Sequence, residues 1–373
     1  MNESVSSSPV SSVGDERFMR LALALGRRNL GRTWPNPAVG AVIVKDGTII
    51  GRGWTQPGGR PHAEIEALHR ARKTAQGAIM YVTLEPCSHH GKSPPCADAI
   101  IRAGVTRVVS AMVDPNPDVA GQGHERLRGK GVVVEIGLCA DEARRAHAGH
   151  ITRMMQGRPY VTLKLAISAD GKAGLAGRKH VAITGEVARE RVFQMRASSD
   201  AILVGIGTIL SDDPQLTCRL PGMSERSPVR VLLDAGLRVP LATSIVATVR
   251  ETPTWVFTSR QPSAIAEEIL QQKGCKVFRV DDRDGSLDLP QVLKVLAEQG
   301  ITQLMVEGGP TVAANFVKAG LVDEAYVLQG EKPIGAGGID PLEGLPLETL
   351  TAAFTSRGTE KLGVDTLESF VRP

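Results

Sequence analysis

The chain has 373 residues, which is more than one hydrophobic core normally holds and enough for two domains. Its 44 Lys and Arg side chains outnumber its 40 Asp and Glu side chains by only four, and aromatic residues make up 3%, so the composition argues against nucleic-acid binding. Apolar runs are too short to span a membrane, and five cysteines are too few and odd in number for a disulfide framework. These features predict a cytoplasmic α/β protein of two domains.

The first half of the chain alternates between helical and strand periodicity. Residues 1–14 are Ser-rich and lack the basic and apolar regions of a secretory signal, so we expect a disordered leader there. The Asp46-Gly47 pair predicts a hairpin turn, and Gly157 and Pro159 end the last helical stretch. We expect a helix from Asp15, strands over 38–44 and 48–54, a helix over 63–75, a strand over 78–84, a helix over 97–103, a strand over 107–113, a helix over 122–130, a strand over 132–137 and an amphipathic stretch over 141–155.

The second half repeats this rhythm without repeating the sequence. A second α/β domain is therefore expected over 158–373, after a first domain over 15–157. Its expected strands cover 160–168, 201–207, 229–234, 252–259, 275–280 and 301–309, and its expected helices cover 186–197, 263–273, 289–299 and 310–320.

Three residues of metal-binding type and one carboxylate stand out in the first half: His62, Glu64, Cys87 and Cys96. Zinc binds imidazole and thiolate ligands, and a catalytic zinc keeps a fourth position for water. Glu64 follows His62 by two residues at a helix start, so it can face the same cleft as a general acid–base group. The pattern matches the H-x-E…P-C-x-x-C signature of zinc deaminases, except that eight residues separate the cysteines. The alternative is two buried structural cysteines and a surface histidine, which the combination of all four residues disfavours.

A second group of residues suggests an anion site in the second half. Gly308 and Gly309 lie between an expected strand and helix, where backbone N–H groups can approach a phosphate. The full dinucleotide-binding fingerprint is missing, and a simple turn is the alternative. Arg196 and Arg219 could clamp a phosphate, or could be ordinary surface arginines.

Several segments resemble a known family. PNPAVGAVIVKDG, PHAEIEAL, YVTLEPCSHHGKSPPCADAI and DPNPDVAGQG resemble the deaminase half of the bifunctional riboflavin-biosynthesis deaminase/reductase, which has the longer cysteine spacing. LKLAISADGK, MRASSDAILVGIGTILSDDPQLTCR and VEGGPTVAANF resemble its reductase half. The resemblance implies a cytidine-deaminase-like α/β/α domain followed by a dihydrofolate-reductase-like α/β domain.

The implied reactions are zinc-dependent deamination of 2,5-diamino-6-(5-phosphoribosylamino)pyrimidin-4-one at ring C2, then NADPH-dependent reduction of its ribosyl group to a ribityl chain. A homo-oligomer, dimer or tetramer, is also implied. For the deaminase, the resemblance assigns substrate binding to Asn36, His89 and Lys92. For the reductase, it assigns substrate binding to His180, Arg196, Leu216, Arg219 and Glu307, and cofactor binding to Ala166, Ala182, Thr208, Asp212, Gly309, Pro310 and Thr311.

The second half departs from the family pattern in two places. His180 stands where the family commonly has a substrate-facing serine, and Ala182 where it has a cofactor-facing tryptophan. LQGEKPIGAGGIDPLEG replaces the usual Ala-Pro-Lys-x-x-Gly-Gly pattern. Besides the bifunctional enzyme, which would need neither a nucleic-acid nor a membrane partner, three alternatives remain at this point. They are a nucleic-acid base deaminase, a scaffold held by a structural zinc with four protein ligands, and a deaminase with an impaired reductase domain.

Overall fold

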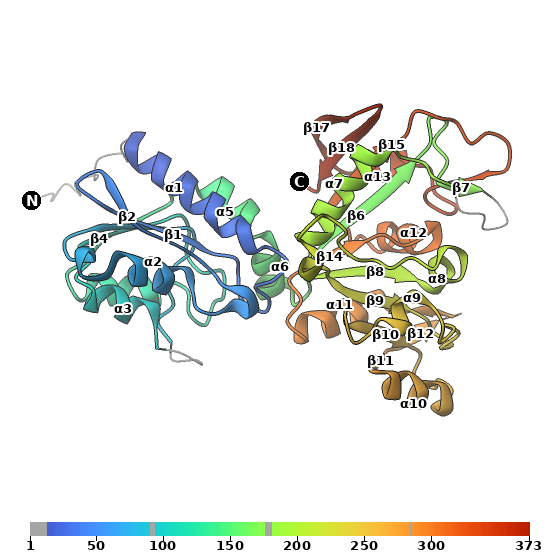
Figure 1. Ribbon diagram of the computed structural model, residues 1–373, viewed down its shortest axis with the longest axis horizontal. Coiled ribbons are helices and arrows are strands. Elements are labelled where there is room, and N and C mark those ends of the chain that lie inside the picture. Colours follow the sequence, from blue (N-terminus) through green and yellow to red (C-terminus); the bar gives the residue numbers. More distant parts are fainter. Residues whose placement is uncertain (1–12, 90–93, 176–180, 284) are drawn as a thin grey trace, which may run out of the picture. The chain divides into compact units, whose positions relative to one another are not determined.

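The computed structural model describes residues 13–89, 94–175, 181–283 and 285–373 (Figure 1). Contacts within the chain divide it after Met155 into two compact units. Of the leader expected over 1–14, the first twelve residues lie outside the described residues, and the last two already belong to a helix. Within the described part of the chain, every helix is too short or too polar to cross a membrane.

The first unit is built on a five-stranded sheet with the order β2-β1-β3-β4-β5. Strand β1 runs antiparallel to both of its neighbours, and β3, β4 and β5 run parallel. The strands are β1 Gly40–Lys45, β2 Thr48–Trp54, β3 Ile79–Val82, β4 Arg107–Ser110 and β5 Val133–Ile136. The helices are α1 Val13–Gly26, α2 Ala63–Ala71, α3 Cys96–Arg102, α4 Gln122–Arg128, α5 Ala140–Ala146 and α6 Ala148–Gln156.

Both faces of this sheet are buried because its strands alternate two sets of apolar side chains. Ala41 and Ile43 belong to a cluster that includes residues of α2, α3 and α4. Val42 and Val44 point to the opposite face and belong to a cluster with α1 and α5. The unit is therefore a three-layer α/β/α sandwich.

Close packing between α2 and β2 fixes the start of α2. A Cβ atom at Gly53 would lie 1.9 Å from the carbonyl oxygen of Ala63, and one at Gly51 would lie 2.4 Å from that of Ala67. The glycines of β2 and the alanines of α2 thus let the two backbones approach directly. This contact places the first turn of α2, where His62 and Glu64 lie.

The stretch expected over 141–155 forms two helices, α5 and α6, which separate at His147. The His147 side chain is buried, and its Nε2 atom lies 3.1 Å from Oγ1 of Thr83. The stretch that periodicity predicts as continuous is therefore divided at a buried polar residue.

The second unit contains a nine-stranded sheet with the order β11-β10-β9-β8-β14-β6-β15-β18-β17. The strands from β11 to β15 are parallel, and β18 and β17 are antiparallel additions at one edge. The strands of this sheet are β6 Tyr160–Ile167, β8 Ala201–Gly205, β9 Val229–Leu233, β10 Thr254–Thr258, β11 Lys276–Arg279, β14 Gln303–Val306, β15 Glu324–Gln329, β17 Thr355–Leu362 and β18 Asp365–Val371. Two further pairs of short strands, β7 Gly174–Leu175 with β16 Gly338–Ile339 and β12 Asp282–Arg283 with β13 Ser286–Leu287, form separate two-stranded sheets. The helices are α7 Glu186–Ala197, α8 Ile206–Asp212, α9 Ser244–Ala247, α10 Ala264–Lys273, α11 Leu289–Glu298, α12 Pro310–Lys318 and α13 Glu348–Thr351.

The expected strand over 201–207 is wrong at its end. The strand stops at Gly205, and the chain turns there into α8, a helix that was not expected. Apolar residues continue from the strand into the first turn of the helix, so the sequence shows no break in polarity. The C-terminal strands after α12 were not expected either.

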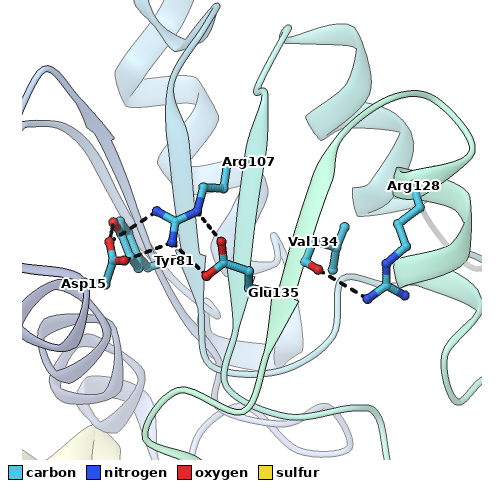
Figure 2. A network of polar contacts seen from close by, with 6 residues as sticks. All are labelled: Asp15, Tyr81, Arg107, Arg128, Val134 and Glu135. Carbon is cyan, nitrogen blue, oxygen red and sulfur yellow. Dashed lines mark hydrogen bonds and ion pairs between the residues drawn. The ribbon is translucent and has the colours of Figure 1, made fainter. Parts of the chain in front are cut away.

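A polar network joins α1 to three strands of the first unit (Figure 2). Arg107 donates to Asp15 at 2.9 and 3.3 Å and to Glu135 at 2.8 Å through two nitrogens. The hydroxyl of Tyr81 also donates to Asp15, and both residues are buried. Because the Asp15 carboxylate is removed from water, the guanidinium of Arg107 is its main compensation.

We expect the Arg107→Ala variant to lower the free energy of unfolding of the first unit by about 2–3 kcal/mol, since it leaves a buried carboxylate without its cation. Urea unfolding measures this loss. The control is Arg144→Ala, which removes an exposed pair with Asp141 and should cost about 0.5 kcal/mol or less. Equal losses in the two variants would contradict the prediction.

Candidate functional site

The three side chains predicted as metal ligands converge in the first unit. His62 immediately precedes α2, Cys87 follows β3 in the chain, and Cys96 is the first residue of α3. Nδ1 of His62 lies 3.7 Å from Sγ of Cys87 and 3.4 Å from Sγ of Cys96. All three ligand atoms lie within 4.8 Å of one another, and in the described part of the chain no other trio of His, Cys, Asp or Glu does so.

The chemistry of the two thiols fits a bound cation. Hydrogen bonds from Cys96, including its backbone N–H at 3.3 Å, lower the pKa of the Cys87 thiol to about 4. The contact with Cys87, together with burial, raises the pKa of the Cys96 thiol well above its usual range. Two thiolates at this distance repel each other unless a positive charge lies between them. Zinc would supply that charge, and three protein ligands leave a fourth position open.

Glu64 lies beside this group in the first turn of α2. Its side chain is 3% exposed, and burial raises the pKa of its carboxyl to about 6, although the charge of His62 opposes the shift. A carboxyl with such a pKa can gain and lose a proton near neutral pH. The position and the environment of Glu64 therefore suit proton transfer.

The side chain of Asn36 lies beside one of the predicted metal ligands, His62. Its side-chain amide donates to the carbonyl of Gly59 at 2.8 Å and lies 3.5 Å from Nε2 of His62. Gly59 has φ +82°, and a Cβ atom there would lie 2.7 Å from Nδ2 of Asn36, so glycine is required for this contact. His89 is exposed, and Lys92 lies outside the described residues.

Asp114 is a further candidate functional residue, which was not predicted from the sequence. Its Oδ1 atom lies 3.4 Å from Nε2 of His150 and accepts the N–H of Asn116 at 2.9 Å. Burial of the Asp114 carboxyl raises its pKa, but these hydrogen bonds and the charge of His89 outweigh that effect. The pKa of Asp114 is therefore lowered. An ionised carboxylate is therefore held within electrostatic reach of His89. The signal in the sequence was an Asp-x-Asn motif after a strand of an α/β sheet, where ligands commonly bind.

The second unit contains a cavity of about 1340 Å³. All described residues that the resemblance assigns to the reductase line this cavity, and His180 lies outside the described residues. The lining residues of this set are Ala166, Ala182, Arg196, Thr208, Asp212, Leu216, Arg219, Glu307, Gly309, Pro310 and Thr311.

A buried ion pair forms part of the cavity wall. Arg196 of α7 donates to both carboxylate oxygens of Glu307, at 2.8 and 2.9 Å. Nζ of Lys164, on β6, lies 3.9 Å from the same carboxylate. Burial lowers the pKa of Lys164, although Glu307 opposes the shift. Sequence reasoning missed Lys164, and the signal that could have found it was a lysine within an otherwise largely apolar strand.

Two further arginines leave this wall positively charged. The Arg219 guanidinium lies 4.9 Å from the ring centroid of Phe193, and Arg189, on the same helix as Phe193, also lines the cavity. Burial and the positive charges of Arg196 and Arg189 lower the pKa of Arg219. Glu307 compensates Arg196, so two guanidinium charges remain to attract an anion such as a phosphate.

The predicted phosphate cradle is partly occupied by the protein itself. Gly309 immediately precedes α12, and its N–H donates to Oγ1 of Thr208 at 3.1 Å. Pro310 has no N–H, and the hydroxyl of Thr311 donates to Glu343. The amides of the first turn beyond Pro310 are therefore the ones that remain for an anion. Gly308 allows the close turn, since a Cβ atom there would lie 2.7 Å from Val312.

Comparison with known proteins covers both units. Residues 12–112 match the family described as "Cytidine and deoxycytidylate deaminase zinc-binding region", and residues 159–367 match "RibD C-terminal domain". The chain is 43% identical to "Riboflavin biosynthesis protein RibD" of Aquifex aeolicus, with 87% of this chain and 88% of that protein covered. Identity to the protein of the same name from Escherichia coli is also 43%, with 89% and 92% covered.

Solved structures give the same result. "Acinetobacter baumannii RibD, form 1" superposes with a TM-score of 0.86 at 36% identity and covers 96% of this chain and 99% of that one. A diaminohydroxyphosphoribosylaminopyrimidine deaminase/5-amino-6-(5-phosphoribosylamino)uracil reductase from Thermotoga maritima superposes with a TM-score of 0.83 at 35% identity, with the same coverage. The family and fold class expected from the sequence are confirmed. The chain belongs to the RibD family of riboflavin-biosynthesis enzymes, which joins a zinc-binding deaminase domain to a reductase domain that uses NADPH.

Proposed function

We propose that the chain deaminates 2,5-diamino-6-(5-phosphoribosylamino)pyrimidin-4-one at ring C2 and then reduces the ribosyl group of the product to a ribityl chain with NADPH. The observation that carries the first reaction is the buried Glu64 beside three converging metal ligands. The arginine-lined cavity supports the second reaction. The Thermotoga maritima relative is named for the same pair of activities.

In the deaminase, His62, Cys87 and Cys96 would hold zinc, which lowers the pKa of a coordinated water to about 7. Glu64 accepts a proton as the water oxygen bonds to C2, and delivers a proton to the departing amine, which leaves as ammonia. Asn36, whose amide lies beside His62, is suited to hydrogen-bond the pyrimidine edge. We assign His89 and Lys92 to substrate binding as well, with Lys92 facing the 5′-phosphate.

In the reductase, NADPH held in this cavity would supply a hydride for C1′, with the C1′–O4′ bond broken and O4′ protonated as the sugar opens. We assign the substrate to Arg196, Leu216, Arg219 and Glu307 together with His180, and the cofactor to the Ala166, Ala182, Thr208, Asp212 and Gly309–Thr311 side of the cavity. Lys164, beside Glu307, adds a partly buried donor for a sugar oxygen. Correct positioning of the two reactants supplies most of the rate in such a reaction.

The same proposal includes a cytoplasmic location and a homo-oligomer, dimer or tetramer, that acts on a phosphorylated pyrimidine without a nucleic-acid or membrane partner. All five cysteines are free thiols, which suits a reducing compartment. The edge strand β17 is exposed from Thr355 to Lys361, so its backbone is accessible for pairing with a second copy.

The Cys96→Ala variant should lose bound zinc, because two protein ligands hold the metal much more weakly than three. Elemental analysis of the full chain should find about one zinc ion per chain in the wild type and almost none in this variant. Cys139→Ala removes a thiol that is outside the ligand group and should keep its zinc. Zinc retained in the Cys96 variant would overturn the ligand assignment.

The Glu64→Gln variant should keep its zinc and lose deamination by about 10²–10⁴-fold, since it lacks the group that moves the proton. Ammonia release measures this loss. Reduction of the already deaminated substrate, followed through NADPH oxidation, should proceed at the wild-type rate. Unchanged ammonia release in this variant would favour a merely structural zinc.

Arg219→Ala should raise the KM for the reductase substrate about 10–100-fold, which corresponds to the loss of charge-assisted hydrogen bonds to a phosphate. Arg189→Ala should have a smaller effect in the same direction, and the KM for NADPH should change little. Arg191 lies on the same helix as Arg189 and forms an exposed ion pair with Glu360, so Arg191→Ala serves as the matched control. A KM that changes equally in all three variants would contradict a specific phosphate site. Absent turnover in the wild type would instead indicate an impaired reductase.

A further inference from the structure

Glu85 is a buried carboxylate that the proposed chemistry does not use. Its side chain is 2% exposed, and it lies two residues before the metal ligand Cys87. Oε1 accepts the backbone N–H groups of Gly123 at 2.8 Å and His124 at 3.2 Å. Oε2 accepts those of Asp114 at 3.0 Å and Gly121 at 2.9 Å. Each oxygen therefore has two backbone donors, all from the segment that precedes and begins α4.

This arrangement makes Glu85 the cap of α4. The residue before the helix, Gly121, has no side chain that could accept a hydrogen bond from the first turn. Glu85 accepts three of the amides at this end of the helix from a different part of the chain. A negative charge is favourable at a helix N-terminus because the unpaired N–H groups carry partial positive charge.

Helix α4 in turn contacts the residues on either side of the first thiol ligand. A Cβ atom at Gly123 would lie 2.0 Å from the carbonyl oxygen of Pro86, so the helix backbone packs directly against the residue before Cys87. Arg126 donates to the carbonyl of Ser88, the residue after Cys87, at 3.3 Å.

The same helix also holds the element that carries the second thiol ligand. Arg126 pairs with both carboxylate oxygens of Asp98, at 2.6 and 2.9 Å. Asp98 lies in the first turn of α3, two residues after Cys96. The N–H of Ala97 additionally donates to the carbonyl of Cys87 at 3.1 Å, which links the two ligand segments to each other.

We propose that Glu85 and Arg126 are positioning residues that act through α4 to set the spacing of the Cys87 and Cys96 thiolates around the metal. This inference rests on the proposed function, since it takes the three ligands as a metal site. Glu85 fixes where α4 begins, and Arg126 transmits that position to both cysteine segments. Groups that orient metal ligands in this way commonly contribute 10–100-fold to metal affinity.

Two variants change this link without touching a ligand. Glu85→Gln keeps the shape of the side chain but replaces one carboxylate oxygen by an NH₂ group. This NH₂ group faces two of the four amide donors and cannot accept their hydrogen bonds. Arg126→Gln removes the contacts with Ser88 and Asp98 from a side chain that is 42% exposed, so folding should be preserved. Arg128→Gln is the matched control because it removes the same charge from the same helix, and Arg128 contacts the carbonyl of Val134 instead (Figure 2).

The test measures zinc affinity of the full-length chains by competition with a chromophoric chelator, and the absorption of the Co²⁺-loaded proteins. We expect Glu85→Gln to weaken zinc binding about 10–100-fold and Arg126→Gln about tenfold, with altered thiolate-to-cobalt absorption in both. Arg128→Gln should match the wild type in both readouts. Reductase turnover reports that the second unit is intact in every variant.

The outcomes separate this inference from the proposed function. A wild-type chain that binds neither zinc nor Co²⁺ would overturn the metal site itself. A wild type that binds both metals, with Glu85→Gln and Arg126→Gln equal to it in affinity and spectrum, would overturn only the positioning role. A lower melting temperature of Glu85→Gln would not rescue the positioning role in that case. A cap that is purely structural lowers the stability of the protein without changing the geometry of the metal ligands.

Discussion

The deaminase site depends on backbone contacts so close that only glycine permits them. Gly53 of β2 lets α2 lie directly on the sheet, and Gly123 of α4 does the same for the chain before Cys87. His62 lies 25 residues before Cys87, and the three ligands belong to three different segments, none of which has a long flexible side chain as its ligand. Their convergence therefore requires that the backbones supporting them be fixed to within a fraction of an ångström.

The two sites use opposite electrostatics within a chain whose net charge is only +4. The first gathers two cysteine sulfurs and a buried carboxyl around one point, which is unfavourable for anions without a cation. The second places three guanidinium groups on one part of a large cavity wall, where Glu307 compensates one of them, and acidic side chains line other parts of the same cavity. Each unit thus has a local charge imbalance of its own, and the small net charge of the whole chain conceals both imbalances.

Much of this could be predicted from the sequence. His62, Glu64, Cys87 and Cys96 are chemically distinctive. The bounds of α7 and β2 agree with those expected: Gly185 and Ser198 flank the helix, and the Asp46-Gly47 turn precedes the strand. The residues that line the cavity were predicted through the resemblance, because its motifs assign roles to particular positions in this chain. The roles of the individual side chains stay predictions.

Other features could not be derived from sequence patterns. Lys164 lies on the half-buried face of β6, where a lysine usually indicates exposure to solvent, and its ion partner Glu307 lies far along the chain. Glu85 lies within a motif that draws attention to its cysteine, and its four amide partners become visible only in three dimensions. The β17–β18 hairpin was missed because β17 is polar along nearly its whole length and has no buried face to produce alternation.

The uncompensated guanidinium groups around Phe193 have a practical consequence for work with this protein. Inorganic sulfate, phosphate and citrate are small multivalent anions that can occupy the same donors as a sugar phosphate. Under the proposed assignment of the substrate phosphate to these groups, buffers and precipitants that contain such anions would compete with substrate in assays and take its position in crystals. Chloride-based media of low ionic strength are therefore the appropriate conditions for measuring the affinity of the reductase domain.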